Sequence, residues 1–253
     1  MNIMDFPLFL FVGSFIVLWA ASRAGIFLRL RSRSQTEQDS HDFDFVTGSV
    51  LTLLGLLIGF SFSMAVTRYD QRKNYEEEEA NAIGTQFVRL DFLPDQEAAA
   101  LRELMKKYLD QRIMFYQARN TSRIDQINAD TARLQNEMWS KVKTAAAANP
   151  HPVMALVVSG MNDVLNRQGY TQAAWWNRIP AAAWGLMFFI SVGCSFLIGF
   201  AVRRPSGSGV FLVIPLAVSV SFLLIADIDS PHGGLIRVKP QNLISLSQSL
   251  RSE

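Results

Sequence analysis

The amino-acid sequence predicts an all-α membrane protein with four transmembrane helices in two hairpins, and with an extramembrane helical domain inserted between helices 2 and 3. The first observation is that charged residues are almost absent from four windows, each close to the roughly 20 residues that cross a hydrocarbon layer. The windows are Phe6 to Ala21, Val46 to Val66, Ala181 to Val202 and Val210 to Ala226. The second is that charge is concentrated between the second and third windows, which predicts a domain in water there.

These windows divide the chain into four parts. We expect residues 1–66 to form the first transmembrane hairpin, 67–178 the helical domain, 179–227 the second hairpin and 228–253 a C-terminal tail. The helical domain is interrupted only by Pro94, Pro150 and Pro152, so its helices should be long.

The first window is expected to remain in the membrane, because it has neither the basic leader nor the small-residue cleavage site of a secretory signal. The segment from Ser34 to Phe45 is rich in Ser, Gln, Glu and Asp, so we expect a loose linker there. On the third window, Ser191, Ser195 and Gly199 are spaced by four residues, as at helix packing sites in membranes.

The second window, Val46 to Val66, carries the functional prediction. No proline or glycine directly follows Val66, so we expect the helix to leave the membrane and to continue to about Gly84. Small residues recur at helical spacing on one side of it: Gly48, Gly55, Gly59 and Ser63. In lipid, such a stripe allows close packing against another helix, either within the chain or in a second copy.

A second line of residues, spaced by four, runs beside this stripe. It consists of Thr52, Leu56, Phe60 and Met64. In an oligomer with a shared axis, this line would face a central pathway and form an apolar constriction. Without such an axis it would face lipid.

Two acidic groups invite interpretation as metal sites, but another interpretation is favoured for each. Glu76 and Glu79 belong to a run of four carboxylates, and on a helix at most these two share a side. We expect a solvated acidic collar, which in an oligomer would enrich cations at the mouth of the pathway. Asp227, Asp229 and His232 lack the spacing of a known metal site, so we expect Asp227, Asp229 and Pro231 to belong to a polar turn at the membrane surface.

Composition and motifs exclude several classes of function. The formal net charge is +2 and there is no basic stripe with interleaved aromatic residues, so we expect no nucleic-acid partner. The single cysteine, Cys194, excludes a disulfide within the chain. No GxSxG, glycine-rich phosphate loop or HExxH motif is present, so we predict neither an enzyme nor a cofactor or metal site.

Short motifs resemble a known family. The run GFSFSMAVTR, Gly59 to Arg68, resembles the end of the pore-lining helix of bestrophin channels, and SPHGG looks like the turn after their last span. The overall plan, with EANAIG at Glu79 to Gly84 and ADIDSP at Ala226 to Pro231, is more similar to the bestrophin-like family of bacterial membrane proteins. This resemblance covers nearly the whole chain.

The resemblance implies a pentameric ion channel in the bacterial inner membrane, with Thr52, Leu56 and Phe60 at the neck of its pore. Thr52 and Leu56 depart from the aromatic and branched residues usual at those positions. The acidic calcium-binding run of animal bestrophins, which follows their last span, is missing from this sequence.

The orientation in the membrane has two conflicting indications. Basic residues follow the first window and none precedes it, which favours the termini and the helical domain outside the cytoplasm. The bestrophin resemblance implies a helical domain in the cytoplasm. Both alternatives stay open at this point.

Two functions follow from these predictions. The first is an oligomeric membrane protein that conducts inorganic ions, with the second transmembrane helix lining the pore, and with the lipid bilayer and further copies of the chain as its partners. The alternative is a non-conducting membrane sensor or scaffold whose helical domain binds a partner. The alternative is supported by the absence of charged residues that would mark an ion relay within the windows.

Overall fold

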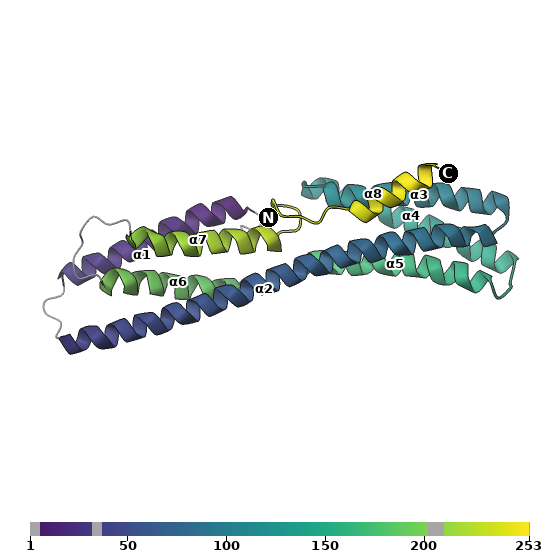
Figure 1. The fold of residues 1–253 in the computed structure, drawn as a ribbon. Helices are drawn as coiled ribbons and strands as arrows, with labels where there is room; N and C mark the ends of the chain where they lie inside the picture. Colours follow the sequence, from purple (N-terminus) through teal and green to yellow (C-terminus); the bar gives the residue numbers. More distant parts are fainter. Residues whose placement is uncertain (1–5, 32–36, 202–209, 253) are drawn as a thin grey trace. The chain divides into compact units, whose positions relative to one another are not determined.

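The computed structural model describes residues 6–31, 37–201 and 210–252, and almost all of them lie in helices (Figure 1). In chain order the elements are α1 (Pro7–Arg31), α2 (Glu37–Arg89), the short 3₁₀ helix η2 (Leu90–Phe92), α3 (Asp95–Gln117), α4 (Thr121–Ala148), α5 (Met154–Trp176), α6 (Ala181–Ala201), α7 (Val210–Asp229) and α8 (Gln241–Ser252). No strand occurs in the described ranges, so the predicted all-α class is confirmed.

Four helical stretches are long and apolar enough to cross a membrane. They are Pro7–Arg31, Phe43–Phe92, Met154–Ala201 and Leu212–Asp229. Of the four windows found in the sequence they contain Pro7 to Ala21, Val46 to Val66, Ala181 to Ala201 and Leu212 to Ala226. The chain is therefore a multi-pass membrane protein.

Helix α2 is longer at both ends than the sequence predicts. We expected a linker from Ser34 to Phe45, and that expectation is wrong for residues 37–45, which form the start of α2; residues 34–36 lie outside the described ranges. Glu, Gln and Asp do not break a helix as Gly and Pro do, and extending a helix that already exists needs no new nucleus. The predicted continuation past Val66 is observed, and it extends to Arg89.

The chain forms two compact units. The first comprises Met1–Thr67 and Arg178–Ile236, and the second comprises Arg68–Asn177 and Arg237–Glu253. The segment after α7 is thus shared between them, because residues up to Ile236 belong to the first unit and α8 belongs to the second.

In the first unit, α1 packs against both α6 and α7 (Figure 1). The α1–α6 contact is close enough that a Cβ at Gly25 or at Gly199 would overlap the backbone of the facing helix. At the same place the Ser22 hydroxyl donates a hydrogen bond to the Ser195 carbonyl at 3.0 Å. Small residues therefore hold α1 and α6 together, as the spacing of Ser195 and Gly199 predicts.

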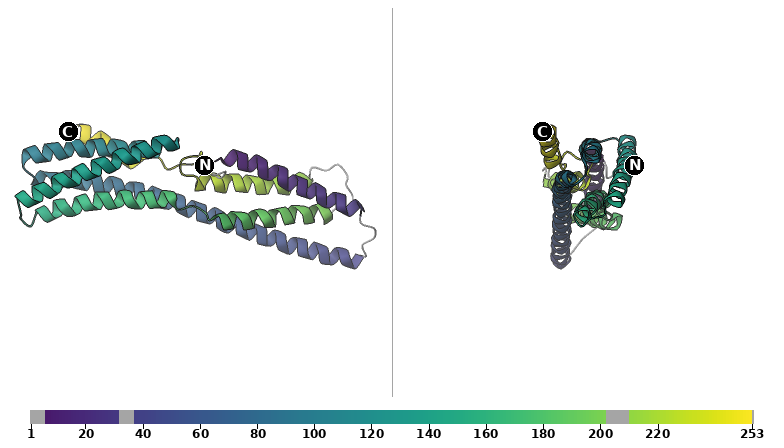
Figure 2. Two further views of the ribbon diagram at one scale, coloured as in Figure 1. Left: turned by 180° about the vertical axis from the view of Figure 1, so that it is seen from behind. Right: turned by 90° about the vertical axis from the view of Figure 1, so that its right-hand side faces the viewer.

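In the second unit, α3 packs against α4 and α8, and α4 packs against α5 (Figure 2). A single apolar core joins these helices to the part of α2 that lies in this unit. Its α4 contribution is a regular seam of buried residues: Ile127, Thr131, Leu134, Met138 and Val142. Spacings of three and four residues place such a seam on one side of a helix.

Candidate functional site

The predicted pathway line on α2 is exposed along its whole length. Leu56 is 52% exposed, Phe60 62% and Met64 40%, and Thr52 is also exposed. Leu54, Ser61 and Ala65 are the buried residues of the same stretch, and they lie on another side of the helix. The rest of the described chain therefore leaves this uncharged line uncovered, and its role in a pathway stays a prediction.

The glycine stripe of α2 is also free of neighbours within the described part of the chain. A Cβ at Gly48, Gly55 or Gly59 would meet no atom within 4 Å, and Ser63 is exposed. Packing within the single chain thus uses Gly25 and Gly199 instead of this stripe. A role of the stripe in packing against a second copy remains a prediction.

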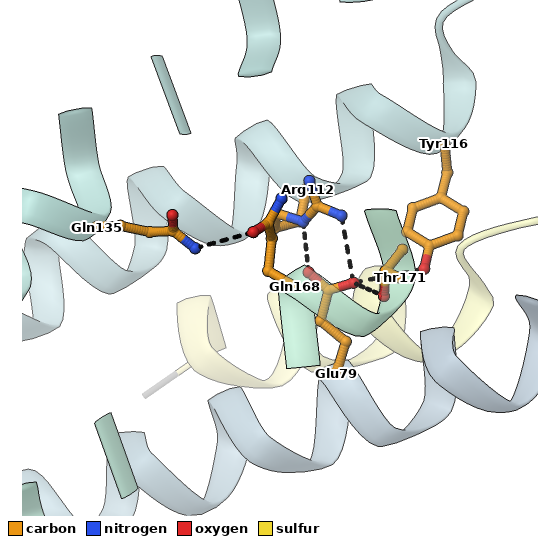
Figure 3. A network of polar contacts seen from close by, with 6 residues as sticks. All are labelled: Glu79, Arg112, Tyr116, Gln135, Gln168 and Thr171. Atoms are coloured by element: carbon orange, nitrogen blue, oxygen red, sulfur yellow. Dashed lines mark hydrogen bonds and ion pairs between the residues drawn. The ribbon is translucent and has the colours of Figure 1, made fainter. Parts of the chain in front are cut away.

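Glu79 is the centre of a buried polar network in the second unit (Figure 3). Arg112 of α3 donates to the Glu79 carboxylate from both Nε and Nη2, with Nη2 3.4 Å from Oε2. The Thr171 hydroxyl of α5 donates to Oε2 at 3.1 Å, and the Tyr116 hydroxyl of α3 does so at 3.4 Å. One carboxylate of α2 thereby binds two other helices.

The network keeps its charged pair although both partners are fully buried. Burial alone would lower the pKa of Arg112, but the charge and the hydrogen bond of Glu79, together with Tyr108 and Tyr116, outweigh this effect and raise that pKa. Burial raises the pKa of Tyr116 as well, so its hydroxyl stays protonated and can donate. The guanidinium also lies 4.5 Å from the centre of the Phe115 ring.

Arg112, Tyr116 and Thr171 are site residues that our sequence analysis missed. The signal for Arg112 was present, because this charged residue continues the apolar side of α3 after Leu104, Tyr108 and Leu109 at helical spacing. A charge within a buried stripe requires a buried partner. The partner is 33 positions away in sequence, so spacing alone does not identify it.

The solvated acidic collar predicted for Glu76 and Glu79 is wrong, because Glu76 is 1% exposed and Glu79 is fully buried. Glu76 accepts hydrogen bonds from the Leu243 N–H at 3.0 Å and from the Asn242 side chain at 2.7 Å. Leu243 is in the first turn of α8, so the carboxylate satisfies a donor that has no partner within that helix. The start of α8 therefore covers Glu76, which the sequence suggested would be exposed to solvent.

A third carboxylate of the run also binds within the unit. Glu78 accepts from Arg167 of α5 at 2.5 Å, and both side chains are partly exposed. The acidic run of α2 therefore serves as a set of internal contacts: Glu76 to α8, Glu78 to α5, and Glu79 to α3 and α5.

Asp227 and Asp229 lie at the end of α7, and both accept hydrogen bonds from backbone N–H groups. Asp227 accepts from the N–H groups of Leu235 and Ile236 at 2.7 and 2.8 Å. Asp229 accepts from the Ile179 N–H, which precedes α6, at 3.1 Å. Both carboxylates are buried and satisfy backbone donors of the first unit, whereas the position of this turn at a membrane surface is still a prediction.

In the ranges that the structure describes, no group of three or more His, Cys, Asp or Glu side chains is arranged to hold a metal ion. The polar clusters found there bind backbone donors or other side chains. These contacts hold helices together.

The fold and these contacts define an all-helical, multi-pass membrane protein that consists of two compact units. The sequence matches the family model of the Bestrophin-like domain over residues 14–243. The chain therefore belongs to the Bestrophin-like family. No curated protein matches the sequence significantly.

Solved structures of a bacterial bestrophin homologue from Klebsiella pneumoniae have a similar fold. A leucine-to-threonine variant of that protein shares 12% identity, over 97% of this chain and 98% of its own, with a TM-score of 0.66. A tryptophan-to-alanine variant shares 13% identity, over 95% of this chain and 97% of its own, with a TM-score of 0.68. At this level of identity the likeness establishes the fold alone.

Proposed function

We propose that the protein is an oligomeric ion channel in which the membrane part of α2 lines the pore. The observation that carries the proposal is the uncharged line from Thr52 to Met64, which the described chain leaves exposed. In a shared central pathway, the large side chains of Leu56 and Phe60 would form an apolar constriction that gates by dewetting.

The glycine stripe supports the same proposal. It lies beside the pathway line, and no part of the described chain occupies it. A neighbouring copy packed along Gly48, Gly55 and Gly59 would bury this side of α2 and would turn the pathway line toward the axis. The number of copies is five by analogy with bestrophins.

The proposal also includes the pairing of the apolar helices, the membrane in which they lie and their orientation. The apolar helices would pair as two hairpins, α1 with α2 and α6 with α7, with the helical domain inserted between them. The membrane would be the bacterial inner membrane. Family membership favours the helical unit in the cytoplasm, whereas the distribution of basic residues favours the opposite side. Cysteine labelling from each side of a sealed vesicle, at exposed positions of α4, decides between the two orientations.

Conductance in planar bilayers tests the proposal. Purified protein should give discrete currents, and Phe60→Ala should change their amplitude or their gating, because it removes the largest side chain of the constriction. Val88→Ala is a matched control, since Val88 is 66% exposed but lies beyond the membrane part of α2. Silent bilayers with correctly folded protein would contradict a channel and would favour the non-conducting sensor or scaffold.

A further inference from the structure

The connection between α3 and α4, Ala118 to Asn120, lies at the end of the second unit where α5 leaves it. The ring of Tyr116, two positions before this connection, packs edge-on against the ring of Trp175 near the end of α5, with 5.3 Å between the ring centres. Trp175 is only six positions before Ala181, the first residue of the apolar helix α6 (181 − 175). The connection is therefore close to the point where the chain enters the membrane.

Helix α2 gives the same level independently. Just after α2, Asp91 binds Arg102 of α3. Glu79 is 12 positions earlier (91 − 79), and it binds Arg112, which is 10 positions later on α3 (112 − 102). The two helices therefore run antiparallel, so that α3 returns along α2 toward the uncharged window 46–66.

Counting along the two helices gives the distance that remains. Glu79 is 13 positions past the end of the window (79 − 66), and the last residue of α3 is five positions past Arg112 (117 − 112). The end of α3 is thus level with a point eight positions past the window (13 − 5), or about 12 Å along α2. The headgroup layer of a bilayer extends roughly 5–8 Å beyond its hydrocarbon. The side chain of an arginine is long enough to cover much of the remaining distance.

Two arginines with unmatched charge lie at this place. Arg119 is in the connection and Arg123 is in the first turn of α4; both are exposed, and neither forms an ion pair with a residue that the structure describes. Helical side chains lean toward the N-terminus of their own helix, so Arg123 leans toward the connection. The nearest acidic residue in sequence is Asp125, which points about 200° away from Arg123 around the helix.

A polar cavity of about 460 Å³ adjoins the connection. Its lining includes Gln111, Ser122 and Arg123, whose amide, hydroxyl and guanidinium groups are donors of the kinds that bind phosphate oxygens. Asp130 also lines the cavity, but it is paired with Arg133 at 3.2 Å, so its charge is balanced. The cavity therefore keeps the positive charge of Arg123.

We propose that Arg119 and Arg123 form a binding surface for anionic phospholipids of the surrounding bilayer, with the phosphate of one headgroup in the cavity beside Arg123. The bilayer is the occupant that both observations favour, because headgroups are within reach of the connection and their charge is opposite to that of the two arginines. Such a contact attaches the α3–α4 hairpin to the membrane surface. The proposal requires the membrane segments alone and does not depend on conduction.

Binding of a fluorescent-tailed phosphatidylglycerol to the full-length protein in detergent tests the chemistry. Wild type should bind this lipid more tightly than phosphatidylcholine with the same tail. Arg119→Gln with Arg123→Gln should weaken phosphatidylglycerol binding roughly thirtyfold, at roughly fivefold for each charge. Lys141→Gln with Lys143→Gln is the matched control, because it removes the same charge from exposed residues about 27 Å further along α4 (18 positions, 141 − 123) and should leave binding unchanged.

Three outcomes of this titration would overturn the proposal. The first is equal affinity of wild type for the two lipids. The second is an equal loss of affinity in the two double variants, which would show that only the total charge matters. The third is displacement of the lipid by soluble glycerol phosphate at similar concentration, which would indicate a site for a free anion and not for the membrane.

The position of the connection is tested separately in vesicles. In a Cys194→Ala background, a fluorescent probe attached to Ser122→Cys should be quenched by lipids that carry a spin label on the headgroup. A probe at Ser140→Cys, an exposed serine near the other end of α4, is the comparison and should be quenched much less. Equal quenching at both sites, or none at Ser122→Cys, would show that the connection does not reach the headgroups and would overturn the proposal.

Discussion

At the scale of single residues, the most informative group is the fully buried pair Glu79–Arg112. A buried ion pair adds little net stability compared with apolar residues of the same size, because both charges lose their hydration. Removing one partner has a much larger effect, because the other charge remains buried and uncompensated. The pair thus makes the second unit sensitive to single substitutions at its centre.

We therefore expect Arg112→Met to destabilise the second unit by about 3–5 kcal/mol. Chemical denaturation in detergent, followed by tryptophan fluorescence, measures this change through Trp175, which packs near Tyr116. Arg133→Met is the matched control, since the Arg133 side chain is 76% exposed and pairs with Asp130 on the surface. Its effect should be within about 0.5 kcal/mol. Equal losses in both variants would contradict a central role of the buried pair.

Glu76 gives the second unit a specific pH dependence. Burial raises the pKa of its carboxyl group, and the hydrogen bonds from Leu243 and Asn242 only partly offset this effect. The native state consequently binds the proton more tightly than the unfolded state. The contribution of Glu76 to stability is fully present below the unfolded pKa of about 4.3, and it is lost as the pH rises through the folded pKa.

Glu76→Gln removes this titration. The free energy of unfolding of the variant minus that of the wild type should therefore increase as the pH rises from about 4 to about 7. Denaturant titrations at several pH values measure the difference. Glu77→Gln, at an exposed neighbour on the same helix, should show no such trend. A difference for Glu76→Gln that stays constant or decreases with pH would contradict the raised pKa.

At the scale of elements, the packing of α1 on α6 depends on two glycines. Any Cβ at Gly199 would overlap the Ser22 backbone, and backbone cannot move aside as the end of a flexible side chain can. In lipid, close approach of helices is what stabilises their association.

Gly199→Val should accordingly lower the midpoint of thermal unfolding of the first unit in detergent by several degrees, with a loss on the order of 1–3 kcal/mol. Gly185→Val, on the same helix, is the control, because a Cβ there meets no described atom within 4 Å. A smaller loss at Gly199 than at Gly185 would show that the two helices separate without penalty.

Helix α2 also shows how the run of four glutamates acquires different roles. Successive residues of a helix point in different directions, so Glu76, Glu78 and Glu79 reach three different partners. Three of the four glutamates therefore make contacts within the unit, although in the sequence the run looks like a uniform charged surface. These contacts can be identified only from the packing of the neighbouring helices.

At the scale of the whole molecule, the proposed channel requires several copies of the chain. Light scattering of the detergent-solubilised protein should give a mass of more than one chain. In a Cys194→Ala background, Phe60→Cys should form disulfides between copies, because residues facing a shared axis approach one another there. Phe189→Cys, at a 78% exposed residue of α6, is the comparison and should cross-link less. A strictly monomeric protein would contradict the proposed pore.

The sequence by itself determined the all-α class, the four apolar stretches and the helical continuation beyond Val66, because these depend on local composition and on the 3.6-residue period. It also carried the motifs by which the chain resembles its family. The burial of Glu76 and Glu79 and the partners of Arg112 were decided only by the tertiary structure. These partners are brought together by the packing of helices that are distant in sequence, and a charged residue's spacing does not specify whether another helix will cover it.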